Sequence, residues 1–271
     1  MMSFRRLILL AALCSTAIDA WAACSRPIIV PASQIGMMVS ISDDGRHVAG
    51  IYPDLLRAYG GTAGCTFLFP VIPRLRAEKM VEAGRADVFL GAVQLPTRDA
   101  WGGFIPMLGS AWTLISIGRR PPPASVRQLL QEPGLKFNAV RGFDDGPAYE
   151  LMLAELDKIG KLEYVNDAVT IVRKMAVGRT TYTFMPSITF AGAVHELGLT
   201  ETLGRDVTYS KLNDIPPAVT GVYISSHLNP GDAAQVKAIL VSIREHHELL
   251  TQMHAAFSAA EMVTYYDLRA R

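Results

Sequence analysis

The residue best placed for binding chemistry is Arg98, which follows a nearly continuous apolar run from Asp87 to Leu95. An apolar run bounded by turn signals, here Pro96, predicts a strand buried on both faces, as in parallel sheets. Open α/β folds bind ligands in the crevice outside the carboxyl ends of such strands. A guanidinium there offers a planar, two-pronged donor to a carboxylate. We therefore expect Arg98 to bind an anion; the alternative is a surface ion pair.

Arg74 is a second cation in an unusual position. The spacing of Ala77, Met80 and Val81 predicts one buried face of a helix that runs from about Arg74 to Ala83. A positive charge at the first turn opposes the helix macrodipole. This conflict suggests contact with a ligand, although a solvated arginine at a helix end is equally compatible with the sequence.

Two acids, Asp144 and Asp145, lie in the loop before a helix that Pro147 is expected to start. Together with Phe143 they are candidates for contact with a polar ligand. The alternative is that the acids cap the helix N-terminus, a position that favours Asp before a first-turn proline.

Sequence motifs for several other chemistries are absent. There is no phosphate-binding loop, dinucleotide-binding turn or nucleophile elbow. The stretch from His247 to Thr251 resembles a zinc-protease helix but has threonine at the second ligand position. His246, His247 and His254 are therefore interpreted as solvated histidines of an amphipathic helix. No metal site and no cofactor are expected.

The elements that must position these residues alternate between strand and helix, which favours an α/β fold with parallel sheets. The expected strands are 28–30, 65–69, 87–95, 112–117, 135–140, 162–165, 182–185 and 219–224. The expected helices are 53–59, which glycines 60 and 61 would end, and 74–83, a short helix near 126, 147–159, 168–177 and one that starts at 230. Two strand-like segments, near 110–117 and 217–224, bracket the middle of the chain. The middle is therefore expected to be an inserted lobe joined by two crossings.

The first 22 residues predict export from the cytoplasm. Arg5 and Arg6 precede a short apolar stretch that ends in an Ala-x-Ala pattern, which is typical of a secretory signal peptide cleaved after Ala22. Removing these residues, which also contain Asp19, reduces 26 basic residues to 24 and 25 acidic residues to 24. A net charge of zero gives no support for nucleic-acid binding. The mature protein is expected in the periplasm, as a monomer.

Two cysteines remain in the exported chain, Cys24 and Cys65, and each precedes an expected strand. If those strands are parallel neighbours, their starts lie side by side and a disulfide is geometrically reasonable. The alternative is two unpaired thiols.

Five segments, in this order, resemble the polar-amino-acid-type solute-binding proteins of ABC transporters: GIYPDLLRAYG, CTFLF, GRADVFLGAVQLPTRDAWGGFIPM, AVRGFDDGPAYELM and GRTTYTFMP. The resemblance covers essentially the whole mature chain. It implies the type II periplasmic binding protein fold: two three-layer α/β lobes joined by two hinge strands, with the ligand enclosed between them. Lobe 1 would comprise 23–110 plus 219–271, and lobe 2 would comprise 111–218.

The resemblance also implies roles for individual residues. Arg98 matches the arginine that grips the ligand's α-carboxylate, and Arg74 matches a position that packs against the ligand. The strand end that usually supplies hydroxyl groups is Gly91 to Gln94 here, so only the backbone, including that of Ala92, and the Gln94 side chain can donate. The acid that holds the ligand's amine is replaced by the stretch 185–187, which has no carboxylate, and Asp144 or Asp145 in the corresponding loop could take its place. A ligand richer in carboxylate than in amine is therefore expected.

The function that the resemblance implies is capture of a small carboxylate-bearing solute, an amino acid or related organic acid, for delivery to a membrane permease of an ABC transporter. One alternative is a ligand-sensing protein that signals to a membrane sensor. Another is an enzyme on the same scaffold, similar to cyclohexadienyl dehydratases, in which Asp144, Asp145 or Glu150 would transfer a proton. No second catalytic group is evident, so we expect a binding protein rather than an enzyme.

Overall fold

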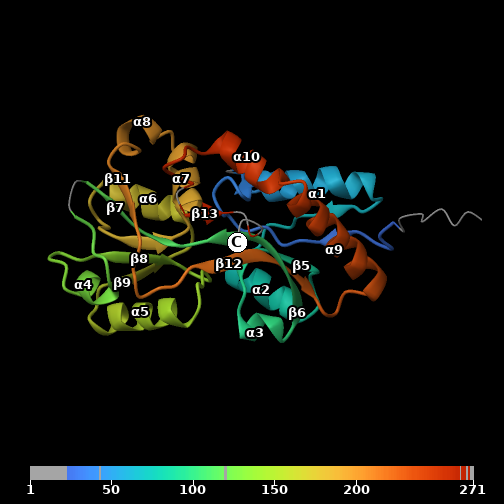
Figure 1. Ribbon diagram of the computed structural model, residues 1–271, viewed down its shortest axis with the longest axis horizontal. Coiled ribbons are helices and arrows are strands. Elements are labelled where there is room, and N and C mark those ends of the chain that lie inside the picture. Colours follow the sequence, from blue (N-terminus) through green and yellow to red (C-terminus); the bar gives the residue numbers. More distant parts are fainter. Residues whose placement is uncertain (1–22, 43, 119–120, 263, 267, 269–271) are drawn as a thin grey trace, which may run out of the picture.

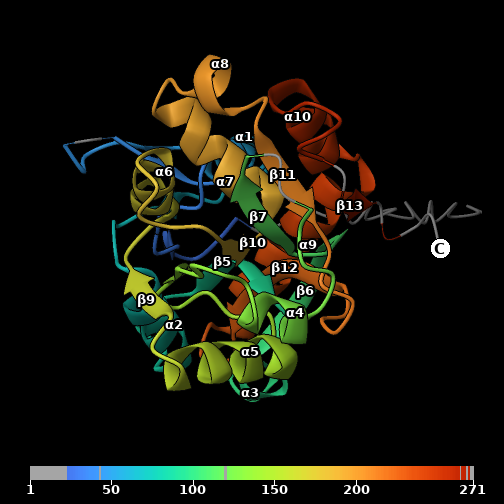
Figure 2. The same cartoon turned by 90° about the vertical axis from the view of Figure 1, so that its left-hand side faces the viewer.

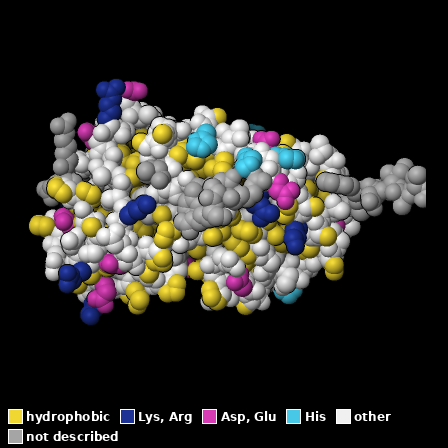
Figure 3. Space-filling view, viewed as in Figure 1, with side chains coloured by type: hydrophobic (Ala, Val, Ile, Leu, Met, Phe, Trp, Pro, Cys, Tyr) yellow, Lys and Arg dark blue, Asp and Glu magenta, His cyan; other side chains and the backbone are white. Residues whose placement is uncertain are grey.

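The computed structural model describes residues 23–42, 44–118, 121–262, 264–266 and 268, and it shows two α/β lobes side by side (Figure 1). The predicted signal peptide lies outside the described residues. Each lobe has a central sheet with helices on both faces (Figures 1 and 2). None of the described helices has the length and apolar content required to span a bilayer. Charged side chains of both signs are interspersed over the face in Figure 3.

The strands of lobe 1 form a mixed sheet. Strands β1 (Ile28–Ile29) and β4 (Phe67–Leu68) pair in parallel, and the Asp87 N–H donates to the Ile29 carbonyl at 2.8 Å, which places β5 beside β1. Strand β5 (Val88–Val93) then pairs antiparallel with β12 (Ala218–Ser225), and β12 pairs with β6 (Gly102–Ser110). The short β13 (Tyr265–Tyr266) pairs with the end of β6, and β2 (Ser40–Ile41) and β3 (Val48–Ala49) form a separate hairpin.

Helices cover both faces of the lobe 1 sheet because successive side chains of β5 point to opposite faces. Val88 and Leu90 pack into the larger apolar cluster under α1 (Ile51–Thr62), α9 (Pro230–Glu245) and α10 (Glu248–Ala256). Phe89 packs on the other face, in the smaller cluster under α2 (Arg74–Glu82), and α3 (Pro96–Asp99) lies nearby. Helix α2 therefore lies against the strand that leads to Arg98.

Lobe 2 is built in the same way around its own apolar cluster. Strands β8 (Phe137–Val140) and β9 (Leu162–Val165) are parallel, and β10 (Thr183–Met185) and β11 (Val207–Ser210) flank β7 (Thr113–Ile117) antiparallel. Helices α4 (Val126–Leu130) and α5 (Pro147–Lys158) cover one side of these strands (Figure 2). Helices α6 (Ala168–Ala176), α7 (Ser187–Glu196) and α8 (Thr200–Leu203) cover the other.

The chain passes between the lobes twice, from β6 into β7 and from β11 into β12, and the two crossings run side by side because Ala218 pairs with Ser110. The lobe boundaries predicted from the sequence remain a prediction.

One predicted helix end is wrong. Helix α1 continues through Gly60, where a side chain would meet the Phe67 ring, and ends at Thr62. Strand β6 was not predicted, and it continues through Pro106 because its ladder is irregular there: Thr220 pairs with Leu108 and Gly221 with Pro106, which leaves Met107 as an extra residue in β6.

Cys24 and Cys65 form a disulfide with Cα atoms 4.8 Å apart. Cys24 precedes β1 and Cys65 precedes β4, and these strands are parallel neighbours. The pairing thus has the geometry expected from the sequence.

Candidate functional site

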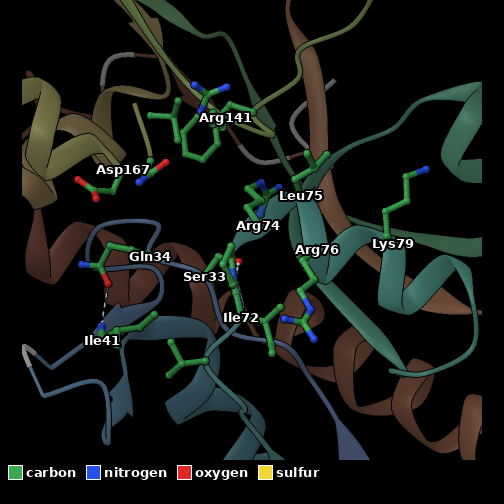
Figure 4. Close-up of a pocket in the computed structure, with 15 residues that line it drawn as sticks. Ser33, Gln34, Ile41, Ile72, Arg74, Leu75, Arg76, Lys79, Arg141 and Asp167 are labelled. Atoms are coloured by element: carbon green, nitrogen blue, oxygen red, sulfur yellow. Dashed lines mark hydrogen bonds between the residues drawn. The ribbon is translucent and has the colours of Figure 1, made fainter. Parts of the chain in front are cut away.

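A cavity of about 700 Å³ opens between the two lobes (Figure 4). Lobe 1 contributes the segment around Ser33 and Gln34 and the start of α2, and lobe 2 contributes the ends of β8 and β9. The charged residues that line the cavity are Arg74, Arg76, Lys79, Arg141 and Asp167. Its apolar lining includes Val71, Leu75 and Phe143.

Arg74 lies at the inner end of this cavity. Its two terminal nitrogens donate to the carbonyls of Leu90 and Gly91 at 3.2 and 2.9 Å. Its Cζ lies 4.5 Å from the ring centroid of Phe89 and 5.5 Å from that of Phe143, within the range of cation–π attraction. The Nε atom is buried and has no hydrogen-bond partner among the described residues. Arg74 therefore retains an unused donor.

The charge of Arg74 persists despite its surroundings. Burial, and to a smaller extent the neighbouring charge of Arg98, lowers the pKa of Arg74 to about 9. Glu78 and Asp144 act in the opposite direction. The side chain is still a cation at neutral pH, in a site where an unpaired charge is poorly solvated.

A second, narrow cavity of about 30 Å³, room for about one water, continues from Arg74 into the interface between the lobes. Arg74 and Phe143 line both cavities. The other lining residues come from both lobes and include Ile35, Gly91, Val93, Trp112, Asp144 and Thr189. Arg74 thus joins an open outer cavity to a nearly filled inner one.

The structure places Arg98 differently from the sequence-based expectation. Its side chain is only 2% exposed, and its Nε and one terminal nitrogen donate to the two carboxylate oxygens of Glu78 at 2.9 and 3.1 Å. The other terminal nitrogen donates to the Val93 carbonyl. Arg98 lines neither cavity. The carboxylate that fills the fork of Arg98 in this arrangement belongs to the protein itself, and the anion-binding role of Arg98 stays a prediction.

The other residues predicted to contact a ligand divide into those that line a cavity and those that do not. Phe143 and Asp144 line the inner cavity, whereas Ala92 is fully buried and Gln94 is exposed, with its amide 3.3 Å from Asp99. Neither Ala92 nor Gln94 lines either cavity. Their predicted contact with a ligand is therefore not supported in this arrangement, and the neighbouring Gly91 and Val93 take that place.

The two acids before α5 have different environments. Asp144 accepts a hydrogen bond from the Gly146 N–H at 2.8 Å, and it does not cap α5, whose N-cap residue Gly146 lacks a side chain. Asp145 is 9% exposed, and neither of its oxygens has a partner among the described residues. Burial, followed by repulsion from Asp144, raises the pKa of Asp145 to about 8. Asp145 lines neither cavity, so only Asp144 is placed to face a solute.

Sequence reasoning missed several residues of the outer cavity. Arg141 directly follows β8, so the rule that drew attention to Arg98 would also have selected it. Arg76 shares the first turn of α2 with Arg74. By contrast, no sequence pattern links Glu78 to Arg98, because they are 20 residues apart and meet only through packing of α2.

Within the part of the chain that the structure describes, no three His, Cys, Asp or Glu side chains are placed to hold a metal ion. His246 instead contacts the Tyr59 hydroxyl through Nδ1 at 3.1 Å.

Comparison with known proteins identifies the fold. No protein-family model matches the chain, and no curated protein sequence matches it. Solved structures do match, and the three described here are each 20% identical or less. A histidine kinase sensor domain with similarity to periplasmic binding proteins is 20% identical with a TM-score of 0.65, over 83% of this chain and 93% of that one. EhuB in complex with hydroxyectoine is 19% identical with a TM-score of 0.66, over 88% of this chain and 91% of that one.

A third match is an ancestral amino-acid-binding protein, a precursor of cyclohexadienyl dehydratase. It is 14% identical with a TM-score of 0.66, over 86% of this chain and 95% of that one. These similarities show that the chain has the fold of type II periplasmic binding proteins. Most of the similar structures are binding proteins, including amino-acid-binding proteins.

Proposed function

We propose that this protein is a periplasmic solute-binding protein that captures a small carboxylate-bearing solute between its two lobes and delivers it to an ABC-type permease. The solute occupies the 700 Å³ cavity, and Arg74 holds its carboxylate. Binding energy realised only when both lobes contact the solute selects the closed arrangement.

The observation that carries the proposal is the unpaired Nε–H of Arg74 at the inner end of an interlobe cavity. A buried donor without an acceptor costs about 1–3 kcal/mol. A solute carboxylate would accept from this donor and would offset the charge of a poorly solvated guanidinium. The hydrogen bonds to Leu90 and Gly91 and the contacts with Phe89 and Phe143 already fix the orientation of the group, so little conformational freedom is lost on binding.

A ligand-sensing role is the second candidate. It is favoured by the similarity to a histidine kinase sensor domain, 93% of which aligns with this chain. Both roles require the same solute site, and they differ in the membrane partner that reads the closed state. Pull-down from detergent-solubilised membranes, with and without solute, separates a permease partner from a sensor kinase.

The binding role is tested by a thermal-shift screen of the mature chain against amino acids, dicarboxylates and small organic acids. We expect at least one carboxylate to raise the melting temperature, and we expect Arg74→Gln to abolish most of that rise. Arg85→Gln is the matched control, because Arg85 is an exposed arginine of lobe 1 that does not line either cavity. An unchanged shift in Arg74→Gln would refute the assignment of Arg74.

Turnover of prephenate or arogenate by the purified protein would instead favour the dehydratase alternative. Of the three acids considered for proton transfer, Asp145 lines neither cavity and Glu150 is exposed, whereas Asp144 lines the inner cavity and is the one candidate placed to face a substrate. Saturable binding without turnover is the result expected of a binding protein.

A further inference from the structure

The lining of the outer cavity carries an excess of positive charge that the chain as a whole does not have. Four cations line it, Arg74, Arg76, Lys79 and Arg141, against one carboxylate, Asp167. The full chain has 26 basic and 25 acidic residues, and both signs are interspersed on the face in Figure 3. The excess is therefore local to the cleft, where low-dielectric walls strengthen its effect on an anion.

Two of these cations are available to a ligand and come from different lobes. Among the described residues, neither Arg76 of lobe 1 nor Arg141 of lobe 2 forms an ion pair, and Arg141 only stacks over the Tyr164 ring at 5.4 Å. Lys79 is different, because Glu82 lies 2.6 Å from its ammonium. Arg76 and Arg141 thus add two uncompensated charges to that of Arg74.

The one carboxylate in the lining has another task. Asp167 accepts a hydrogen bond from the Thr170 N–H at 2.7 Å and caps the N-terminus of α6. A carboxylate held there is stabilised by the helix dipole, and one of its two oxygens is already used by the cap. The outer cavity therefore offers an ammonium group one partly engaged carboxylate, against four cations for an anion.

The cavity also contains apolar surface that the fold leaves uncovered. Val71 is 42% exposed and Leu75 is 56% exposed, and both line the cavity. Phe143 and Val140 face it from lobe 2. Exposed apolar residues gathered in a concave site favour a ligand with a carbon skeleton to cover them, rather than a small hydrated anion.

We propose that the cleft takes an organic anion with two or more carboxylates on an apolar ring or chain, and that Arg76 and Arg141 select for the carboxylates beyond the first. The inference rests on the proposed binding function. Arg74 holds one carboxylate, Arg76 and Arg141 attract the others from opposite lobes, and Val71, Leu75 and Phe143 cover the carbon skeleton. No ammonium group is required on the ligand.

The test is titration calorimetry with a matched series of probes. Benzoate, isophthalate and benzene-1,3,5-tricarboxylate keep the ring and vary the number of carboxylates, and terephthalate and the aliphatic diacids from glutarate to pimelate vary their spacing. Glutamate and phenylalanine supply the ammonium group. We expect the tightest probe to be a di- or tricarboxylate that binds at least tenfold more tightly than the monocarboxylate. Raising the salt concentration should weaken the tightest probe more than benzoate.

The variants Arg76→Gln and Arg141→Gln test whether these two arginines select for the carboxylates beyond the first. Each should weaken the tightest probe about tenfold, the typical value of one charge-assisted contact, and leave benzoate within twofold. Arg85→Gln in lobe 1 and Arg173→Gln in lobe 2 remove the same charge from exposed positions outside both cavities and should change neither affinity.

The possible results separate the two proposals. If phenylalanine or benzoate binds more tightly than every diacid, or if Arg76→Gln and Arg141→Gln bind the tightest probe like the wild type, the diacid inference is wrong and the binding function stands. If no carboxylate in the series binds, both are wrong. Unaltered folding of each variant is checked by its far-UV circular dichroism spectrum.

Discussion

Glu78 fills the guanidinium fork of Arg98, with Nε to Oε1 at 2.9 Å and a terminal nitrogen to Oε2 at 3.1 Å. The pair joins α2 to the segment that follows β5, and its arginine is almost fully buried. A protein carboxylate therefore occupies the place where the sequence predicted a solute carboxylate. Arg74, four residues before Glu78 on the same helix, is the arginine that lines the cavity.

The first prediction concerns the stability contributed by this pair. Arg98→Gln leaves the Glu78 carboxylate without its partner, so we expect the free energy of unfolding to fall by about 3 kcal/mol. Glu78→Gln/Arg98→Gln should recover part of the loss, because no uncompensated charge remains. Urea denaturation measures both. Arg205→Gln, which breaks the exposed pair between Arg205 and Glu201, is the control and should leave the midpoint unchanged. If Arg98→Gln kept the wild-type stability but bound solute more weakly, Arg98 would instead be the residue that binds the solute's carboxylate.

The sequence predicted the elements better than it predicted side-chain directions. Residues 162–165 were predicted as a strand with the bounds that β9 has, and α2 begins at Arg74 as its apolar spacing indicated. Periodicity determines such elements locally. The orientation of Arg98 depends on a contact with Glu78 that forms only when α2 packs on the sheet, so no local pattern contains it. The sequence placed the end of α1 at Gly60, and this failed for a related reason. A glycine is favoured inside α1 because a larger residue at position 60 would collide with the Phe67 ring.

The second prediction concerns the disulfide. Cys24 and Cys65 are 41 residues apart, and closing a loop of that size restricts the unfolded chain enough to contribute about 4 kcal/mol. Cys24→Ser/Cys65→Ser should therefore unfold at a lower denaturant concentration than the oxidised protein. Dithiothreitol should destabilise the wild type by a similar amount and should not affect the variant. Equal midpoints for oxidised and reduced wild type would contradict the prediction.

The third prediction concerns pH and Asp145. Its pKa of about 8 in the folded state exceeds the value of about 4 in an unfolded chain, so between these values the folded state holds a proton that the unfolded state has lost. The free energy of unfolding should therefore fall as pH rises from about 4 to about 8, by up to about 1.4 kcal/mol per pH unit from this group. The neutral side chain of Asp145→Asn removes that contribution.

The measurement is urea unfolding of the wild type and Asp145→Asn at pH 5, 6.5 and 8. The variant should gain stability relative to the wild type as pH rises. Asp206→Asn, a substitution at an exposed carboxylate of lobe 2, is the control and should follow the wild-type profile. Parallel profiles for wild type and Asp145→Asn would show that Asp145 is ionised in the folded state throughout this range.

The fourth prediction concerns a close backbone contact between the two lobes. Gly36 of lobe 1 packs directly on α7 of lobe 2, and a Cβ added at Gly192 would lie 2.7 Å from the Met37 nitrogen and 3.0 Å from the Gly36 Cα. These are backbone atoms that cannot move aside alone. Beside this contact, the Gln34 amide donates to Glu196 at 2.6 Å. Even the methyl group of an alanine at residue 192 should therefore push the two lobes apart.

Gly192→Ala should raise the radius of gyration measured by small-angle X-ray scattering in the absence of solute. It should also weaken solute binding about tenfold, because part of the binding energy must now close the lobes. Gly61→Ala is the control, since Gly61 lies on α1 with no atom within 4 Å of an added Cβ. If Gly192→Ala kept both the wild-type radius and the wild-type affinity, the contact between Gly36 and α7 would have no part in closure. The energy of closure would then have to come from contacts with the solute itself.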